Sequence, residues 1–245
     1  MNAKIICTLL KKDLKGCLSN KNILVSFLIP VVFCFIYQYM FSGLGEDVNT
    51  YVLSMCAVFA ISIIPSSILP VMIAEEKEKY TLRSLMLARV RGQEFLASKM
   101  AVCLLMVLAD AAAVFFISGG SIDRFPIYIT AALISAAGLC FLGALAGLTA
   151  KDQSSAGTLS APLMLITMLP PFFSGLNDTV AKLAVIVPTT SFQTLYSAAG
   201  AGEGIFTGRC LTALSVCAVD RRWICVIQPV LPQERDRLLT CQICD

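Results

Sequence analysis

The chain lacks histidine altogether and has little charge. Without histidine, neither a His-based zinc site nor a Ser–His–Asp triad can form. Charged residues make up 14% of the 245 residues and hydrophobic residues 57%, whereas a soluble domain has about 25% charged residues. The mean hydropathy of +0.79 agrees with this balance. The composition argues against a water-soluble fold and predicts a membrane protein, and the net charge of +3 is too small to indicate a nucleic-acid partner.

The eleven cysteines do not indicate a disulfide scaffold. Four of them lie inside apolar runs: Cys34, Cys56, Cys103 and Cys140. A thiol in such a place behaves as a small hydrophobic side chain. The single CxxC, Cys241 to Cys244, stands alone, whereas a structural zinc site needs four ligands. We therefore predict no metal site and no catalytic residue in this chain.

Five apolar runs are long enough to cross a bilayer. A hydrocarbon core of ~30 Å needs about 20 residues of helix. The runs cover residues 23–41, 51–74, 100–118, 127–150 and 158–176. The first run could instead be a signal peptide, but it is longer than an h-region of about 7–15 residues and lacks a clear cleavage site. The sequence predicts an all-α polytopic membrane protein with five to six transmembrane helices.

Two segments beside these runs have their own patterns. Before the first run, apolar residues recur at helical spacing: Ile5, Ile6, Leu9, Leu10, Leu14, Cys17 and Leu18. This spacing predicts an N-terminal amphipathic helix on the membrane surface, with a solvated basic leader as the alternative. Residues 183–202 contain no charged residue and are long enough for another span. Pro188 and the polar residues after it nevertheless favour an outer re-entrant hairpin over a true span.

The C-terminal end changes character. The apolar run at 210–219 is too short to cross a bilayer, so we expect an incomplete sixth span. Residues 220–245 then hold eight charged residues and the only tryptophan, Trp223. The segment 219–245 is either a genuine cytoplasmic or interfacial tail or the product of a shifted reading frame. The transmembrane domain is accordingly predicted to cover residues 1–218.

Lysine and arginine occupy alternate loops. The segment before the first run and the block at 75–99 are rich in them, and Lys151 follows the fourth run, whereas the intervening loops hold only Arg124 and Lys182. Positive loops face the cytoplasm. We therefore expect a multi-pass protein of the plasma membrane with a cytoplasmic N-terminus and a cytoplasmic block at 75–99.

The block at 75–99 has the pattern of a docking helix. Acidic residues come first, where a helix N-terminus favours them, and an apolar ridge follows. The residues proposed to contact a partner are Glu75, Glu76, Glu78, Thr81, Leu82, Leu85 and Met86. The alternative is that these charges only keep a loop in water.

Two further features lie inside the apolar runs. Asp110 is an intramembrane acid, which is costly unless it faces protein or water; it is either a pathway or proton-linked site or a structurally satisfied acid. Gly143 and Gly147 have GxxxG spacing, which permits close helix packing but also arises by chance.

The order of these elements resembles the membrane (permease) subunit of a type-2 ABC exporter over about residues 1–218. In that family the block carries a Gly-Thr-Leu, a leucine-rich turn, a proline and a lysine at the start of the next span. Here Tyr80-Thr81-Leu82 and Lys99 match, but Tyr80 replaces the glycine and Arg89 stands where the proline lies. Both replacements loosen the match.

The resemblance implies a transmembrane subunit of an ATP-driven exporter, which moves a substrate outward. The chain has no GxxxxGK[ST] loop, so ATP would be bound by a separate ATP-binding cassette subunit, and this chain would hold no cofactor. A second permease copy or a paralogue would complete a dimer in the lipid bilayer. The alternatives are a non-transporting membrane anchor or assembly protein, or a secondary transporter, which would need several intramembrane ionisable groups and an internal repeat.

Overall fold

The computed structural model describes residues 3–41, 46–81, 85, 87, 90, 92–173 and 187–200. The incomplete span expected at 210–219 and the tail at 219–245 lie outside these residues. So do Leu82, Met86 and Arg89 of the charged block.

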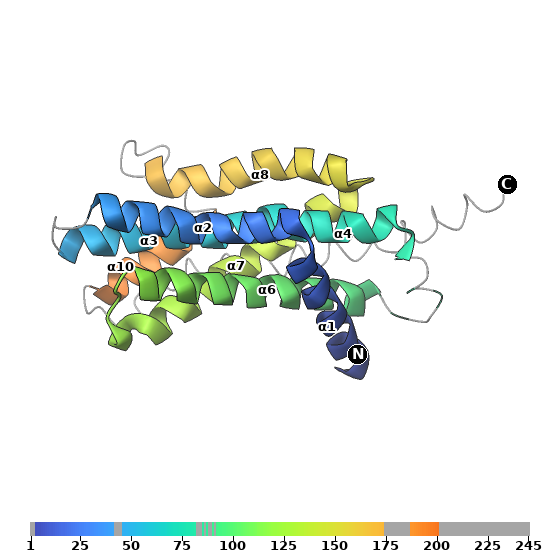
Figure 1. The fold of residues 1–245 in the computed structure, drawn as a ribbon, viewed down its shortest axis with the longest axis horizontal. Helices are drawn as coiled ribbons and strands as arrows, with labels where there is room; N and C mark the ends of the chain where they lie inside the picture. Colours follow the sequence, from blue (N-terminus) through green and yellow to red (C-terminus); the bar gives the residue numbers. More distant parts are fainter. Residues whose placement is uncertain are drawn as a thin grey trace.

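The described residues form helices and no strand, which confirms the all-α prediction. The elements are α1 (Ala3–Ser19), α2 (Lys21–Met40), α3 (Glu46–Ile63), the π-helical turn η1 (Ile64–Ile68), α4 (Leu69–Glu78), α6 (Gly92–Ile117), the 3-10 turn η2 (Ile122–Arg124), α7 (Phe125–Thr149), α8 (Gln153–Phe173) and α10 (Pro188–Gly200). The long helices lie side by side in a bundle, and α1 leaves the bundle at an angle near the start of α6 (Figure 1).

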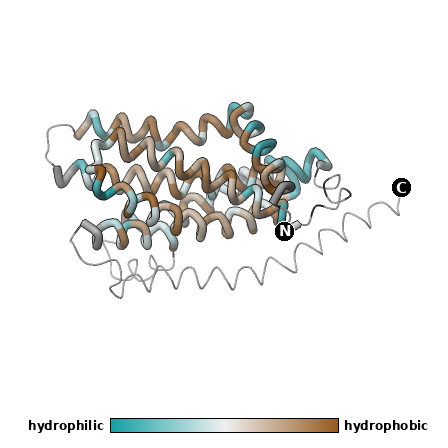
Figure 2. Tube along the Cα trace, turned by 90° about the horizontal axis from the view of Figure 1, so that it is seen from below, coloured by the Kyte–Doolittle hydropathy of each residue, from teal (hydrophilic) through white to brown (hydrophobic). Residues whose placement is uncertain are grey.

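Five helical stretches are long and apolar enough to cross a membrane: Lys21–Met40, Asn49–Glu78, Gly92–Ile117, Ile122–Thr149 and Gln153–Phe173. Hydrophobic residues follow their length, and hydrophilic residues gather toward their ends (Figure 2). Each stretch contains most of one predicted run. The stretch Asn49–Glu78 is the most enclosed of the five: 78% of its apolar 18-residue segment is buried, against 17% for α2 and 22% for α8. The helix α3–η1–α4 is therefore central, and α2 and α8 present apolar faces outward.

The central helix contains the π-helical turn because of its prolines. Pro65 lies inside the turn and Pro70 just after it. Proline has no N–H and its ring clashes with the carbonyl of the residue four earlier, so a wider turn relieves the conflict. On α7, a Cβ added to Gly143 would lie 2.1 Å from the Pro65 carbonyl oxygen, and one added to Gly147 would lie 2.9 Å from Pro70 Cα. The GxxxG spacing thus brings α7 against the π turn of the same chain.

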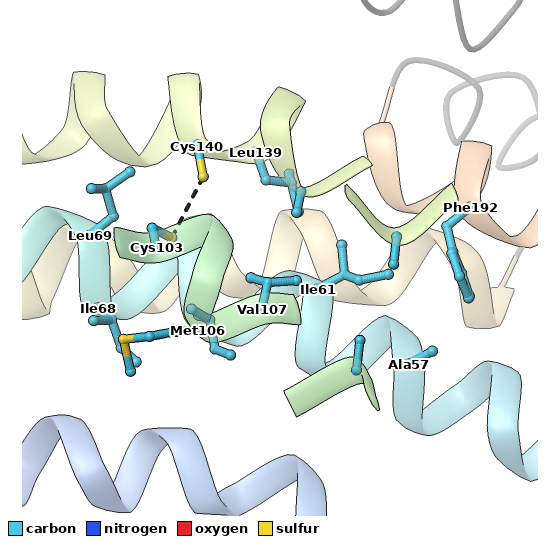
Figure 3. Packing of buried hydrophobic residues seen from close by; sticks show 14 of the residues in the cluster. Ala57, Ile61, Ile68, Leu69, Cys103, Met106, Val107, Leu139, Cys140 and Phe192 are labelled. Carbon is cyan, nitrogen blue, oxygen red and sulfur yellow. Dashed lines mark hydrogen bonds between the residues drawn. The ribbon is translucent and has the colours of Figure 1, made fainter. Parts of the chain in front are cut away.

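The core between these helices is apolar and includes thiols. Figure 3 shows Ala57 and Ile61 of α3, Val107 of α6, Leu139 of α7 and Phe192 of α10 packed together. The Cys140 thiol lies 3.5 Å from the Cys103 thiol, between α7 and α6. The six cysteines described are free, so these thiols serve as small core side chains.

The polar stretch at 188–191 begins a helix. Pro188 is the first residue of α10, a position where proline's missing N–H does no harm. Thr189 is fully buried, and its hydroxyl donates to the Thr167 carbonyl of α8 at 2.6 Å. A helix therefore begins at Pro188, and the re-entrant hairpin stays a prediction.

Candidate functional site

Four charged side chains meet where α1, α4 and α6 converge at one end of the bundle. Lys99 Nζ lies 2.9 Å from Asp13 Oδ1 and 3.1 Å from Glu76 Oε1. Lys12 Nζ lies 2.8 Å from the same Glu76 oxygen. The Thr81 hydroxyl also donates to Glu76. We call Lys12, Asp13, Glu76 and Lys99 the charged junction.

Three of the four junction residues are removed from solvent. Lys99 is 3% exposed, Asp13 6% and Glu76 7%. Burying a charge is costly unless it is paired and hydrogen-bonded. Two carboxylates here face one buried ammonium and the half-exposed Lys12, so the formal charges balance. Removing one partner of such a buried pair typically costs about 3–5 kcal/mol, because it leaves the other charge uncompensated.

The spacing of α1 places Asp13 in the junction. Leu9, Asp13 and Cys17 are buried and lie four residues apart, so they form one stripe on the helix. Leu10 and Leu14 also pack against the core, whereas Lys11 and Lys15 are exposed. The apolar side of α1 therefore packs on the bundle, and its location at the membrane surface stays a prediction.

The thiol of Cys17 lies at the contact between α1 and the bundle. Its sulfur donates to the Met72 sulfur of α4 at 3.5 Å. Burial raises the pKa of Cys17 to about 11, although the nearby Lys99 ammonium acts in the opposite direction. The thiol therefore stays protonated at neutral pH, and it sits between α1 and α4.

The other charges in the last turn of α4 tie it to α7 and α8. Lys77 Nζ donates to the carbonyls of Leu148 at 2.8 Å and Ala150 at 2.7 Å, which caps the C-terminal end of α7. A Glu78 carboxylate oxygen accepts from the Gln153 backbone N–H at 3.0 Å, at the start of α8. One helical turn thus connects to α1 and α6 through Glu76, and to α7 and α8 through its neighbours.

The Glu75 carboxylate pairs with Lys79 one turn later. This contact raises the pKa of the exposed Lys79 ammonium.

The predicted docking residues therefore have several different environments. Glu76 is buried in the junction, and so it does not belong to an exposed surface. Thr81 contacts Glu76, and Leu85 packs against the core. Glu78 is exposed, yet it holds α8. Among the described residues of the block, the large hydrophobic side chains open to solvent are those of Tyr80, 71% exposed, and Leu87, 77% exposed.

Sequence reasoning missed Asp13, Lys12 and the capping role of Lys77. A signal for Asp13 was present, because it is the only acid among residues 1–45 and falls on the apolar stripe of α1. An isolated acid on a buried helical face needs a cationic partner. The lysine that the family places at the start of the next span, Lys99, is that partner.

Tyr80 ends the charged turn in an unusual backbone conformation. Its φ is +55°, in the left-handed region that disfavours side chains other than glycine. The turn that a family glycine would allow is therefore present here, with tyrosine in its place.

Asp110 lies inside the bundle, not toward lipid. It is fully buried on α6, and neither carboxylate oxygen has a hydrogen-bond partner among the described residues. The next residue, Ala111, accepts a hydrogen bond from Tyr128 of α7 at 3.1 Å. The pathway role and the purely structural role of Asp110 both stay predictions.

The apolar helices and their internal charged junction define a multi-pass helical membrane protein. A family model described as ABC-2 family transporter protein matches residues 43–219, more than half of the chain. The chain therefore belongs to the ABC-2 transporter family and is a membrane component of an ABC transporter. No curated protein matches the chain.

Proposed function

We propose that this chain is the transmembrane subunit of an ATP-driven exporter in the plasma membrane. It would move a substrate outward when a separate ATP-binding cassette subunit engages the block between α4 and α6. Family membership supports the transporter class. The observation that supports coupling at this block is the last turn of α4, whose contacts reach α1, α6, α7 and α8.

The exposed part of the block is the proposed contact for the ATP-binding subunit. Tyr80 and Leu87 are the exposed side chains described there, and Leu82 and Met86 stay candidates from the sequence pattern. Glu75 and Glu78 would add negative charge at the edge of this surface. Glu76 acts inside the chain, so its effect on the partner would be indirect.

A second permease copy or a paralogue would pack against the outward apolar faces of α2 and α8. A groove of about 280 Å³ lies there, lined by Ser26 of α2, Ser67 of η1 and Ser160 of α8 among others. Small and hydroxyl side chains of this kind permit close helix contact in a bilayer. The same face would otherwise contact lipid.

The test is co-purification with an ATP-binding cassette subunit expressed together with this chain. We expect the wild-type chain to retain that subunit. Leu87→Asp and Leu82→Asp should lower the amount retained about tenfold, which corresponds to a loss of about 1.4 kcal/mol of binding. Ile122→Asp is the matched control, because Ile122 is 75% exposed in η2, which follows the far end of α6. Leu85→Asp is unsuitable, since Leu85 packs against the core.

If the wild-type chain retains no ATP-binding subunit, the exporter proposal fails and a membrane anchor becomes the better description. If both aspartate variants bind as well as the Ile122→Asp control, the exposed part of the block is not the docking surface.

A further inference from the structure

We propose that the charged junction is an ionic link that makes α1 move with the charged block. Lys99 and Asp13 would then be positioning residues, which transmit a displacement of the block to α1. The movement of the block itself rests on the proposed function. The link between α1 and the bundle does not, and it can be tested on the chain alone.

The first argument is that Glu76 is shared. Lys12 of α1, Lys99 of α6 and Thr81 of the block all donate to its carboxylate. Thr81 lies in the block, so a displacement of the block at Thr81 acts on the Glu76 carboxylate. The same carboxylate binds Lys12 of α1 and Lys99 of α6. On Asp13, only Oδ1 is hydrogen-bonded, to Lys99, and the buried Oδ2 has no partner among the described residues, so Asp13 depends on Lys99 alone.

The second argument is the burial of the pair between Lys99 and Asp13. If α1 stayed in place while the block and α6 shifted, the carboxylate of Asp13 would lose its cation inside the protein. An unpaired buried charge is far less favourable than a paired one. Following the block is therefore the lower-energy response for α1.

The third argument is that packing beside the junction is incomplete. A cavity of about 160 Å³ lies between α1 and α4, and Gly16, Cys17 and Met72 are among the residues that line it. A Cβ added to Gly16 would meet no atom within 4 Å. At this level α1 is joined to α4 directly by the pair of Lys12 with Glu76, and indirectly through Lys99, beside the contact of Cys17 with Met72.

The first measurement is the rate at which a maleimide labels Cys17, relative to Cys7, in the isolated chain. Cys7 is exposed on the same helix and normalises the rate, whereas Cys17 is buried and its raised pKa slows its reaction. Peptide mass spectrometry distinguishes the two thiols. Lys99→Met and Asp13→Asn should each raise the ratio about tenfold, the change expected when local opening becomes easier by about 1.4 kcal/mol.

Two control variants separate this link from general loss of structure. Lys99→Arg keeps the cation and should hold the ratio within about twofold of wild type, because both pairs can re-form. Lys15→Met removes an exposed charge of α1 that lies outside the junction and its cavity, and it should leave the ratio unchanged. If Lys99→Met does not fold, the isosteric Asp13→Asn variant decides. Unchanged ratios in both Lys99→Met and Asp13→Asn would overturn the ionic link.

The second measurement repeats the labelling in the complex with the ATP-binding subunit, with and without a non-hydrolysable ATP analogue. In the wild type, the analogue should leave the ratio within about twofold, since α1 moves with the block and Cys17 keeps its contact with Met72 of α4. In Asp13→Asn, with the ATP-binding subunit still retained, the analogue should raise the ratio about threefold or more, because α1 no longer follows the block.

If the analogue raises the wild-type ratio as much as the Asp13→Asn ratio, α1 does not follow the block, and if it changes neither ratio, the ion pair is not what makes α1 follow. Either result would make the coupling role wrong. If no ATP-binding subunit is retained at all, the coupling role falls together with the proposed function. The first measurement still decides whether the ion pairs hold α1.

Discussion

At the scale of single residues, Tyr80 stands out because its backbone is in the left-handed region, which a residue with a side chain rarely adopts. A left-handed conformation costs a residue with a Cβ about 1–2 kcal/mol, and glycine avoids that cost. The tyrosine side chain is 71% exposed, so little packing compensates. A glycine would adopt this backbone conformation without strain, whereas the tyrosine adopts it at a cost.

We expect Tyr80→Gly to raise the free energy of unfolding by about 1 kcal/mol, because it removes the strain and loses little contact. Thermal unfolding of the purified chain in detergent measures this as a rise of about 2–4 °C in Tm. Tyr80→Ala is the control, since alanine keeps the Cβ and the strain, and it should give no rise. An equal gain from alanine would show that the strain is not the cause.

Residue identity alone did not reveal how the charges of the block are used. The sequence pattern grouped Glu75, Glu76 and Glu78 as contacts for a partner, whereas in the fold each of them binds a different part of this chain. The contacts of Glu76 come from Lys99, 23 positions away, and from Lys12, 64 positions away. A local pattern shows which charges share a turn, but it cannot show which distant charges the fold brings opposite them.

At the scale of elements, the contact between α7 and the π turn is so close that it requires glycine at position 143. A Cβ on Gly143 would overlap a backbone carbonyl, which cannot move away as a side chain can. The GxxxG spacing was visible in the sequence, but its partner was not. Periodicity identifies a face of a helix, and only the fold shows what lies against that face.

We expect Gly143→Ala to lower the free energy of unfolding by about 2 kcal/mol or more, because overpacking forces α7 away from Pro65. Gly157→Ala in α8 is the matched control, since a Cβ there meets no atom within 4 Å. That change should be neutral or stabilising by about 0.5–1 kcal/mol, as expected for alanine in place of glycine in a helix. Thermal unfolding of both variants measures the difference. Equal effects at the two positions would mean that the close contact with the π turn does not exist.

At the scale of the whole molecule, the five candidate membrane helices were predictable because hydropathy is a property of neighbouring residues. Each predicted run falls largely within one of the helical stretches observed. The start of α6 was less predictable. The segment 92–99 carries charges, so the sequence pattern placed it in the block. In the structure it forms the first turns of α6, because Phe95, Leu96 and Lys99 are buried against the bundle.

The orientation of the bundle gives the last prediction. Cys7 of α1 and Ile122 of η2 are exposed, and three candidate membrane helices, α2, α3–α4 and α6, separate them. Three crossings place two residues on opposite sides of a membrane. Because the lysines of α1 and of the charged block favour the cytoplasm, we expect a membrane-impermeant maleimide to label Cys7 only in inside-out vesicles. An Ile122→Cys variant should be labelled at position 122 only in right-side-out vesicles, as read by peptide mass spectrometry. Reversed labelling would mean that the orientation is wrong. Labelling of both sites from one side would instead mean that one of the three helices does not cross, since an odd number of crossings cannot leave both residues on the same face.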